Sequence, residues 1–286
     1  MYKILAREEL APITKLMVIE APEVARKAQP GQFVIVRIDE EGERIPLTIA
    51  DFDRRAGTIT IILQEVGKST MQMGMLEVGD GFLSFTGPLG EPSKIENYGT
   101  VLCVGGGVGI APLFPIACAL REAGNYVISI IGARHKELLF WEEKMHSASD
   151  ELIVCTDDGS YGRKALVTVP IRELLEQRDD VSRIWAIGPA IMTKFCSLTA
   201  QPFHVPIIVS LNSIMVDGTG MCGACRVEVG GRTRFVCVDG PEFDGRDVDW
   251  DQLLARQRIY LGEEKLAREK FEHECCSKHK SSGSAV

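Results

Sequence analysis

The chain has 286 residues, of which 45% are hydrophobic and 25% are charged, and its formal net charge is -8. This composition is ordinary for folded globular protein, and the length favours two domains. The negative charge argues against a nucleic acid or an anionic membrane surface as the main partner. The first residues include Lys3, Arg7 and Glu8 and lack the apolar core of a secretory signal, so we expect a cytoplasmic protein.

Residues 1 to about 97 consist of short runs rich in β-branched residues, separated by turn residues. The runs at 13–19, 33–38 and 58–63 have the length and composition of strands. Many short strands joined by turns favour a closed antiparallel arrangement, because each strand must bury one face. We therefore expect residues 1–97 to form an antiparallel β-barrel.

From about residue 98 the pattern changes to strands alternating with helices. Apolar strands are predicted at 101–104, 126–131, 152–155 and 184–187, with helical periodicity between them. Such alternation is typical of a parallel sheet covered on both faces. Residues 98–206 are accordingly expected to form an α/β domain.

One stretch of this second domain imitates a membrane span, since residues 100–120 contain no charge and have about the required length. Four glycines and two prolines interrupt the stretch and would break a lipid-exposed helix. A buried strand, a glycine turn and a short helix fit these residues better.

The remaining residues divide into two segments. Residues 207–246 are rich in glycine, hold three clustered cysteines and predict a small metal-holding module. Residues 247–275 predict a highly charged helix, and the final SSGSAV has the composition of a disordered tail. We treat 247–286 as a C-terminal helix and tail.

The nine cysteines fall into different classes. A cytoplasmic chain keeps its thiols reduced, so a disulfide framework is not expected. Cys103, Cys118, Cys155 and Cys196 stand singly in apolar surroundings, which predicts small buried hydrophobes.

The clustered cysteines form the pattern Asp217-x4-Cys222-x2-Cys225-x11-Cys237. Thiolates are ligands that iron-sulfur clusters use, and the interleaved glycines let the backbone fold closely around a cluster. The alternatives are a structural zinc site or cysteines that only pack. Zinc sites usually have two paired knuckles, whereas one is present here.

A glycine-rich turn follows the strand at 101–104. Its backbone can approach a pyrophosphate closely, and the next helix presents free N–H groups there. A side chain at Gly107 or Gly109 is expected to fill the pyrophosphate's space. Polar residues after two later strands extend this crevice at the carboxyl edge of the sheet. Its candidate residues are Gly105, Gly106, Gly107, Val108, Gly109, Ala111, Pro112, Arg134, Asp157, Asp158, Gly188, Pro189 and Met192.

Three motifs mark the barrel: RIPLT at 44–48, GKST at 67–70 and GPLG at 87–90. An arginine can pair with a flavin diphosphate, and a threonine hydroxyl can hydrogen-bond a flavin ring nitrogen. Taken alone, each motif is an ordinary turn, and Arg44 is equally well explained as a solvated strand arginine.

The order of these motifs resembles the ferredoxin-reductase-like flavoproteins, and among them the electron-transfer subunits of dihydroorotate dehydrogenase. The segments ERIPLTIADFD and CVDGPEFDGRDVDWDQL look most similar to the small subunit of NADH-dependent ferredoxin:NADP oxidoreductase, also called sulfide dehydrogenase. The resemblance covers residues 1 to about 255.

The resemblance implies a barrel that binds FAD, a sheet that binds NAD(H) and a terminal [2Fe-2S] module. The implied flavin contacts are Arg44, Ile45, Pro46, Leu47, Thr48, Ile62, Leu63, Gln64, Ser69 and Thr70. The implied cluster ligands are Asp217, Cys222, Cys225 and Cys237.

This chain departs from the family pattern at three positions. Ile45 separates Arg44 from Pro46, where the dihydroorotate-type pattern has no gap, and Gln64 stands where a basic residue is frequent. Asp217 occupies the place of the first of four cysteines. Its carboxylate is a harder ligand than a thiolate. The alternative is that Asp217 only starts a turn with Gly218.

The expected function is electron transfer between NAD(H), FAD and the cluster, in a heterodimer with a larger iron-sulfur flavoprotein subunit. Ferredoxin would react through that subunit. No acid-base pair is required, because the cofactors carry the chemistry. Arg134 and His135 could meet a 2′-phosphate, but Asp157 and Asp158 favour NAD(H). The alternatives are a dihydroorotate dehydrogenase subunit and a zinc-binding adaptor regulated by nucleotide.

Overall fold

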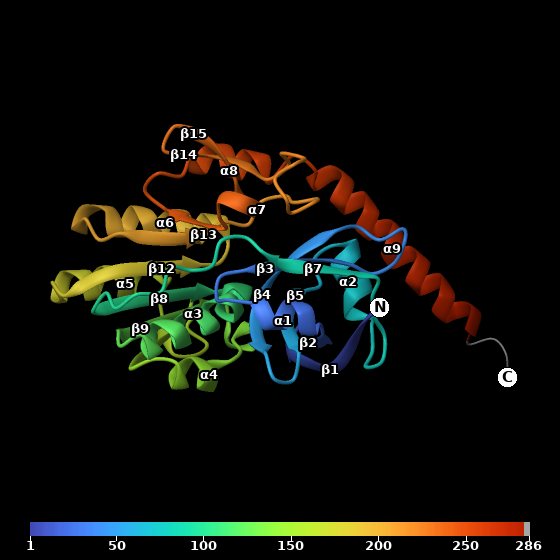
Figure 1. Cartoon of the computed structure of the whole chain (residues 1–286), viewed down its shortest axis with the longest axis horizontal. Coiled ribbons are helices and arrows are strands. Elements are labelled where there is room, and N and C mark those ends of the chain that lie inside the picture. The colour runs from blue at the N-terminus through green and yellow to red at the C-terminus, as the bar shows by residue number, and fades with distance from the viewer. Residues whose placement is uncertain (283–286) are drawn as a thin grey trace.

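The computed structural model describes the backbone of residues 1–282 and the side chains of residues 1–274. The side chains of Cys275 and Cys276, and most of the tail expected to be disordered, lie outside the described residues. Two large sheet domains lie side by side, and the segment from β14 to α8 lies across them (Figure 1).

The first domain is a seven-stranded antiparallel sheet that curls into a near-closed barrel, as the sequence predicts. Its strand order is β6-β1-β2-β5-β4-β3-β7. Met17, Ile19, Ile59 and Ile61 fill its interior, because alternate residues of the paired strands β2 and β5 point inward. The strands are β1 (Tyr2–Ala11), β2 (Thr14–Glu20), β3 (Phe33–Arg37), β4 (Ile45–Asp53), β5 (Thr58–Gln64), β6 (Gly81–Phe82) and β7 (Ser84–Leu89), with the helices α1 (Pro22–Lys27) and α2 (Lys68–Gly74).

The second domain is a sheet of order β11-β10-β9-β8-β12-β13-β16, parallel except for its last strand. Its strands are β8 (Thr100–Gly106), β9 (Tyr126–Ala133), β10 (Glu151–Thr156), β11 (Arg163–Lys164), β12 (Val181–Ile187), β13 (Ile207–Ser210) and β16 (Glu242–Asp244). The connecting helices are η1 (Gly107–Gly109), α3 (Ile110–Glu122), η2 (Lys136–Leu138), α4 (Glu142–Ser147), α5 (Thr168–Gln177), α6 (Ala190–Ala200) and η3 (Gln201–Phe203).

The strand order reverses at β8, which has β9 on one side and β12 on the other. Loops that leave such neighbouring strands toward opposite faces open a crevice at the carboxyl ends of the strands. The glycine turn after β8 and the turn after β12 therefore lie next to each other.

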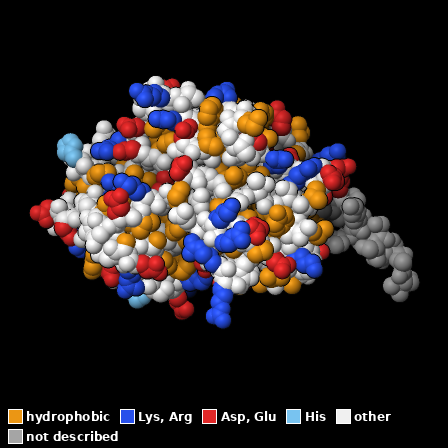
Figure 2. Space-filling view, in the orientation of Figure 1, with side chains coloured by type: hydrophobic (Ala, Val, Ile, Leu, Met, Phe, Trp, Pro, Cys, Tyr) orange, Lys and Arg blue, Asp and Glu red, His pale blue; other side chains and the backbone are white. Residues whose placement is uncertain are grey.

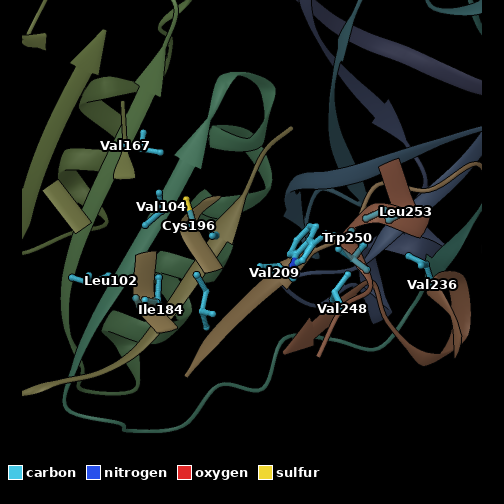
Figure 3. Packing of buried hydrophobic residues seen from close by; sticks show 14 of the residues in the cluster. Leu102, Val104, Val167, Ile184, Cys196, Val209, Val236, Val248, Trp250 and Leu253 are labelled. Atoms are coloured by element: carbon cyan, nitrogen blue, oxygen red, sulfur yellow. The ribbon is translucent and has the colours of Figure 1, made fainter. Parts of the chain in front are cut away.

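The segment of residues 212–256, which we call the cysteine-rich segment, packs against this sheet. It contains β14 (Arg226–Val229), β15 (Arg232–Phe235), α7 (Val236–Asp239) and α8 (Trp250–Arg256). Trp250 and Leu253 of α8 share one buried cluster with Val209 and Ile184 of the sheet (Figure 3). Burial of these apolar side chains fixes the segment to the second domain.

The charged C-terminal stretch forms two helices where the sequence predicts one. α8 ends at Arg256, and α9 (Leu261–Ser282) begins after a short turn. The split follows from burial, since Trp250 and Leu253 anchor α8 whereas Leu261 and Leu266 are exposed. α9 contacts α2 of the barrel and projects from the body (Figure 1).

The surface carries both signs of charge. On the face shown in Figure 2, basic and acidic side chains are interspersed. Among the described residues, no helix combines the length and the apolarity that crossing a bilayer requires. The uncharged stretch at 100–120 is instead the strand β8, a glycine turn and most of α3.

Candidate functional site

Residues 217–225, which we call the cysteine loop, rest on the edge of the barrel. Gly218 has a φ of +79°, and a Cβ built there would lie 2.6 Å from Cδ1 of Ile35 and 2.7 Å from Cδ1 of Leu89. Only glycine combines this left-handed conformation with so close an approach. The cysteine loop, which carries Asp217, Cys222 and Cys225, is thereby seated on strands β3 and β7, whereas Cys237 lies in α7.

Two of the four candidate ligands already lie together. The Sγ atoms of Cys225 and Cys237 are 3.3 Å apart, and both residues are buried. Burial and the neighbouring Cys225 thiol raise the pKa of Cys237 to about 12, although the N–H of Gly220 partly offsets this. Without a metal Cys237 therefore holds its proton, which a metal would have to displace.

The other two candidates form a second pair. The carboxylate of Asp217 accepts hydrogen bonds from the N–H groups of Thr219 at 2.8 Å and Cys222 at 2.9 Å, and these donors lower its pKa. Asp217 thus closes the loop as a turn residue, and its remaining lone pairs stay available to a ligand.

The described residues form no ready-made site for a single metal ion. Within the described part of the chain, no three His, Cys, Asp or Glu side chains converge on one point as a mononuclear metal requires. The candidate ligands instead lie as one close thiol pair, Cys225 with Cys237, and one pair joined through the backbone, Asp217 with Cys222.

The four isolated cysteines behave largely as expected. Cys103, Cys155 and Cys196 are buried, and Cys118 is partly buried. Burial raises the pKa of Cys196 to about 12 and that of Cys118 to about 11. These thiols are therefore neutral and poorly suited to bind metal.

The glycines of the turn after β8 differ in what an added side chain would meet. Side chains at Gly106 and Gly109 would collide with the Sδ of Met192 and the carbonyl of Ile187, respectively. Gly107 has a φ of +55° and faces open space. The expectation that a side chain at Gly109 would fill ligand space is therefore wrong, because Gly109 serves the close contact between two strand ends.

The neighbouring turns contribute the remaining crevice residues. Val108, Gly188 and Met192 are partly buried, Pro189 is exposed, and Gly105, Ala111 and Pro112 are buried beneath the turn. The contact of Gly109 with Ile187 and of Gly106 with Met192 brings the two turns together. The turns after β8 and β12, both of which the sequence singles out, thus lie against each other.

Beyond β9 and β10 the crevice becomes acidic. Asp158 accepts hydrogen bonds from the N–H of Ser160 at 2.9 Å and from its hydroxyl at 2.7 Å, which lowers the pKa of Asp158. Desolvation and the neighbouring Asp158 raise the pKa of Asp157, although this residue is exposed, whereas Arg134 opposes the shift. A cavity of about 350 Å³ lies nearby, lined by Glu142, Glu143, His146 and Tyr161.

The candidate flavin residues gather at one end of the barrel. Pro46 pairs with Ile35 and Thr48 with Phe33, while Gln64, at the end of β5, pairs with Thr14. Arg44 is exposed at this rim, Ile45 and Leu47 are partly buried in β4, and Ile62 and Leu63 are buried in β5.

The two hydroxyl residues of α2 already have partners. Thr70 accepts hydrogen bonds from the N–H groups of Val66 and Gly67, each at 3.1 Å, and so caps the helix. Ser69 donates a hydrogen bond to the carboxylate of Glu43. A bound diphosphate would therefore meet the backbone of this turn, with Ser69 exchanging its partner.

Contacts that the sequence does not predict connect the barrel with the cysteine-rich segment. Ile35 pairs with Pro46 and also touches the cysteine loop at Gly218. Gly90, in the GPLG motif, packs on Gly240 and Pro241 of the cysteine-rich segment. These contacts have no local signature, since they depend on how separate domains meet.

The sequence of the cysteine-rich segment matches a known domain family. Residues 212–249 match the model of the iron-sulfur cluster binding domain of dihydroorotate dehydrogenase B. The chain is 54% identical over 254 residues to the "Dihydroorotate dehydrogenase B (NAD(+)), electron transfer subunit homolog" of Thermotoga maritima, covering 88% of this chain and 89% of that protein.

The chain belongs to the family of dihydroorotate dehydrogenase B electron transfer subunits. The subunit of this name from Desulforamulus reducens is 33% identical over 260 residues, which cover 87% of this chain and 97% of the relative. The resemblance found in the sequence is confirmed, and the chain is an electron-transfer subunit of an oxidoreductase.

Solved structures agree with this family. A chain from the structure of an NADH-dependent reduced ferredoxin-NADP oxidoreductase superposes with a TM-score of 0.90 at 49% identity, covering 95% of this chain and 98% of that chain. A ferredoxin NADP+ reductase from Neisseria gonorrhoeae gives a TM-score of 0.58 at 18% identity, covering 71% and 90%. The ferredoxin-reductase-like fold expected for this electron transfer subunit is confirmed.

Proposed function

We propose that this chain moves electrons between NAD(H), FAD and one [2Fe-2S] cluster, within a complex that contains a larger subunit. The contact of Gly218 with Ile35 carries the proposal, because Ile35 pairs with Pro46 of the flavin motif. The cysteine loop and the flavin rim therefore share one strand. When bound, FAD converts the two-electron chemistry of a nicotinamide into single-electron steps.

Residues 1–97 would hold the flavin. Arg44, at the rim, would pair with the diphosphate, and the Thr48 hydroxyl would hydrogen-bond the flavin ring. Ile45, Pro46, Leu47, Ile62, Leu63 and Gln64 would line the ring and its side chain. The turn that contains Ser69 and Thr70 would present its backbone to the flavin. The Thr70 hydroxyl holds this turn in shape, because it accepts a hydrogen bond from the N–H of Gly67.

Residues 98–206 would bind the nicotinamide nucleotide. Gly107 faces open space and would admit the pyrophosphate, while Gly106 and Gly109 hold the two strand ends together. Asp157 and Asp158 favour NAD(H), because a 2′-phosphate would meet their charge, only partly balanced by Arg134.

Residues 207–246 would hold the cluster through Asp217, Cys222, Cys225 and Cys237. Cys225 and Cys237, whose sulfurs lie together, would bind one iron, and Asp217 and Cys222 would bind the other. Glycine N–H groups around the sulfurs would stabilise their negative charge.

The partner would be a larger iron-sulfur flavoprotein subunit, docked through α9, with ferredoxin reacting through that subunit. The similarity to the NADH-dependent reduced ferredoxin-NADP oxidoreductase chain, at 49% identity over nearly the whole length, favours this assembly. A dihydroorotate dehydrogenase partner is the second candidate, supported by the relatives named for that enzyme.

Anaerobic purification tests the cofactor assignment. The proposal expects a yellow-brown protein with one FAD and about two irons per chain, whose flavin is bleached by NADH. A colourless protein that contains zinc would contradict it and support a nucleotide-regulated adaptor. Co-purification with either candidate large subunit decides between the two assemblies.

A further inference from the structure

A carboxylate lies where the barrel, the sheet and the cysteine-rich segment meet. Glu242 is in β16, which follows Cys237 in the chain and pairs antiparallel with β13 at the edge of the parallel sheet. Its side chain is partly buried, and its two oxygens face two other parts of the molecule.

Each oxygen accepts a hydrogen bond from a different domain. The hydroxyl of Ser93, in the segment between β7 and β8, donates to Oε1 at 2.6 Å. The indole N–H of Trp185, in β12, donates to Oε2 at 3.4 Å. Ser93 is itself tied to the barrel, since its N–H donates to the carbonyl of Pro30 at 2.9 Å.

Backbone contacts surround this carboxylate. The N–H of Glu91 donates to the carbonyl of Gly240 at 2.6 Å, and the N–H of Leu211 donates to that of Pro241 at 2.9 Å. A Cβ at Gly90 would lie 2.8 Å from Cδ of Pro241. The barrel end, the sheet and the segment that follows Cys237 therefore meet in one rigid junction.

A carboxylate shielded from water loses hydration, and its hydrogen bonds must compensate for that loss, so its position is strongly constrained. We propose that Glu242 is a positioning residue, which fixes the cysteine-rich segment relative to the barrel and so sets the separation of flavin and cluster. The role rests on the proposed function, because electron tunnelling falls steeply with distance and needs a held geometry.

Hydrogen exchange of the purified holoprotein tests the junction without any electron transfer. Ser93→Ala removes one donor, and Glu242→Gln removes the charge and one acceptor. Loss of a buried hydrogen bond of this kind raises local opening by about 5- to 100-fold. We expect exchange in β16 and the 211–217 segment to rise by this factor in both variants.

Ser149→Ala is the matched control. Its hydroxyl is similarly buried and donates to Ser129 at 2.6 Å, but it lies in the sheet domain away from the junction. Exchange in β16 should stay as in the parent. Equal exchange of β16 in Ser93→Ala and Ser149→Ala would overturn the proposal.

Single-turnover reduction by NADH gives the second readout. We expect the rate of flavin bleaching to stay within about twofold and the rate of cluster reduction to fall at least about tenfold in Ser93→Ala and Glu242→Gln. Unchanged cluster reduction in both variants would refute the positioning role. If the parent contains no flavin or cluster, the proposed function fails instead, and hydrogen exchange still reports on the junction.

Discussion

Gly218 lies against Ile35, so that the cysteine loop and the strand beside the flavin motif are in direct contact. A Cβ at Gly218 would be 2.6 Å from Cδ1 of Ile35, and its φ of +79° disfavours any side chain. The contact joins two segments that lie far apart in the sequence.

Gly218→Ala should displace the loop from the barrel and cause loss of iron. The clash and the left-handed backbone together should cost about 2 to 4 kcal/mol of local stability. Gly231→Ala is the control, because Gly231 has a φ of +70° but faces open space. Iron content and thermal unfolding check this, and equal iron loss in both variants would contradict the packing argument.

Gly107→Val and Gly109→Val should fail in different ways. The Gly107 variant should fold, keep its flavin and bind NADH at least about tenfold more weakly, since its side chain enters open crevice space. The Gly109 variant should give a lower yield of soluble protein, because its side chain would collide with the carbonyl of Ile187. Flavin content, NADH titration and expression yield separate the two, and parental NADH affinity in Gly107→Val would show that the turn is misassigned.

Asp217 is expected to bind iron as well as close its loop. Asp217→Cys should keep the cluster and lower its reduction potential, because a thiolate donates more electron density than a carboxylate. Asp217→Ala should give a labile cluster. Electron paramagnetic resonance with a redox titration measures both effects, and spectra and potentials identical to the parent would leave Asp217 as a turn residue only.

Stability should depend on pH through Glu242. Desolvation raises the pKa of Glu242 above its ordinary 4.5, although the hydrogen bonds from Ser93 and Trp185 partly oppose this. The Cys103 thiol lies near this carboxylate and is kept neutral by its burial. A raised pKa means that the folded state binds the proton more tightly than the unfolded state does. Protonated Glu242 therefore adds its full stabilisation below about pH 4.5, and this stabilisation is lost as the pH rises through the folded-state pKa.

Glu242→Gln cannot lose that proton. The melting temperature of the variant relative to the parent should therefore increase as pH rises from about 4 to 7, on top of a constant loss for the broken hydrogen bond. Thermal melts at several pH values measure the difference. A difference that is flat or falls with pH would place the pKa of Glu242 at or below its ordinary value.

Truncation after Tyr260 should release the large subunit without unfolding this chain. The cut removes α9 and spares α8, whose Trp250 and Leu253 are buried. Most side chains of α9 up to residue 274 are exposed, so the melting temperature should change by a few degrees at most. Unchanged co-purification with the large subunit would count against docking through α9.

The sequence by itself determined the features that are local. Strand periodicity in β2, β3 and β5, the glycine turn after β8 and the spacing of Cys222, Cys225 and Cys237 all appear in short windows, because backbone sterics and side-chain alternation act over a few residues. The two sheets and the positions of the candidate sites follow from these patterns.

Only the tertiary structure decided how the parts meet. Ser93 and Glu242 are 149 residues apart, and Glu242 looks like any other acid of its segment until the sheet edge and the barrel enclose it. The different roles of Gly107 and Gly109 likewise depend on the carbonyl of Ile187, which the fold brings to one of them. Desolvation and close packing depend on neighbours in space, and those neighbours are fixed only when the domains have packed together.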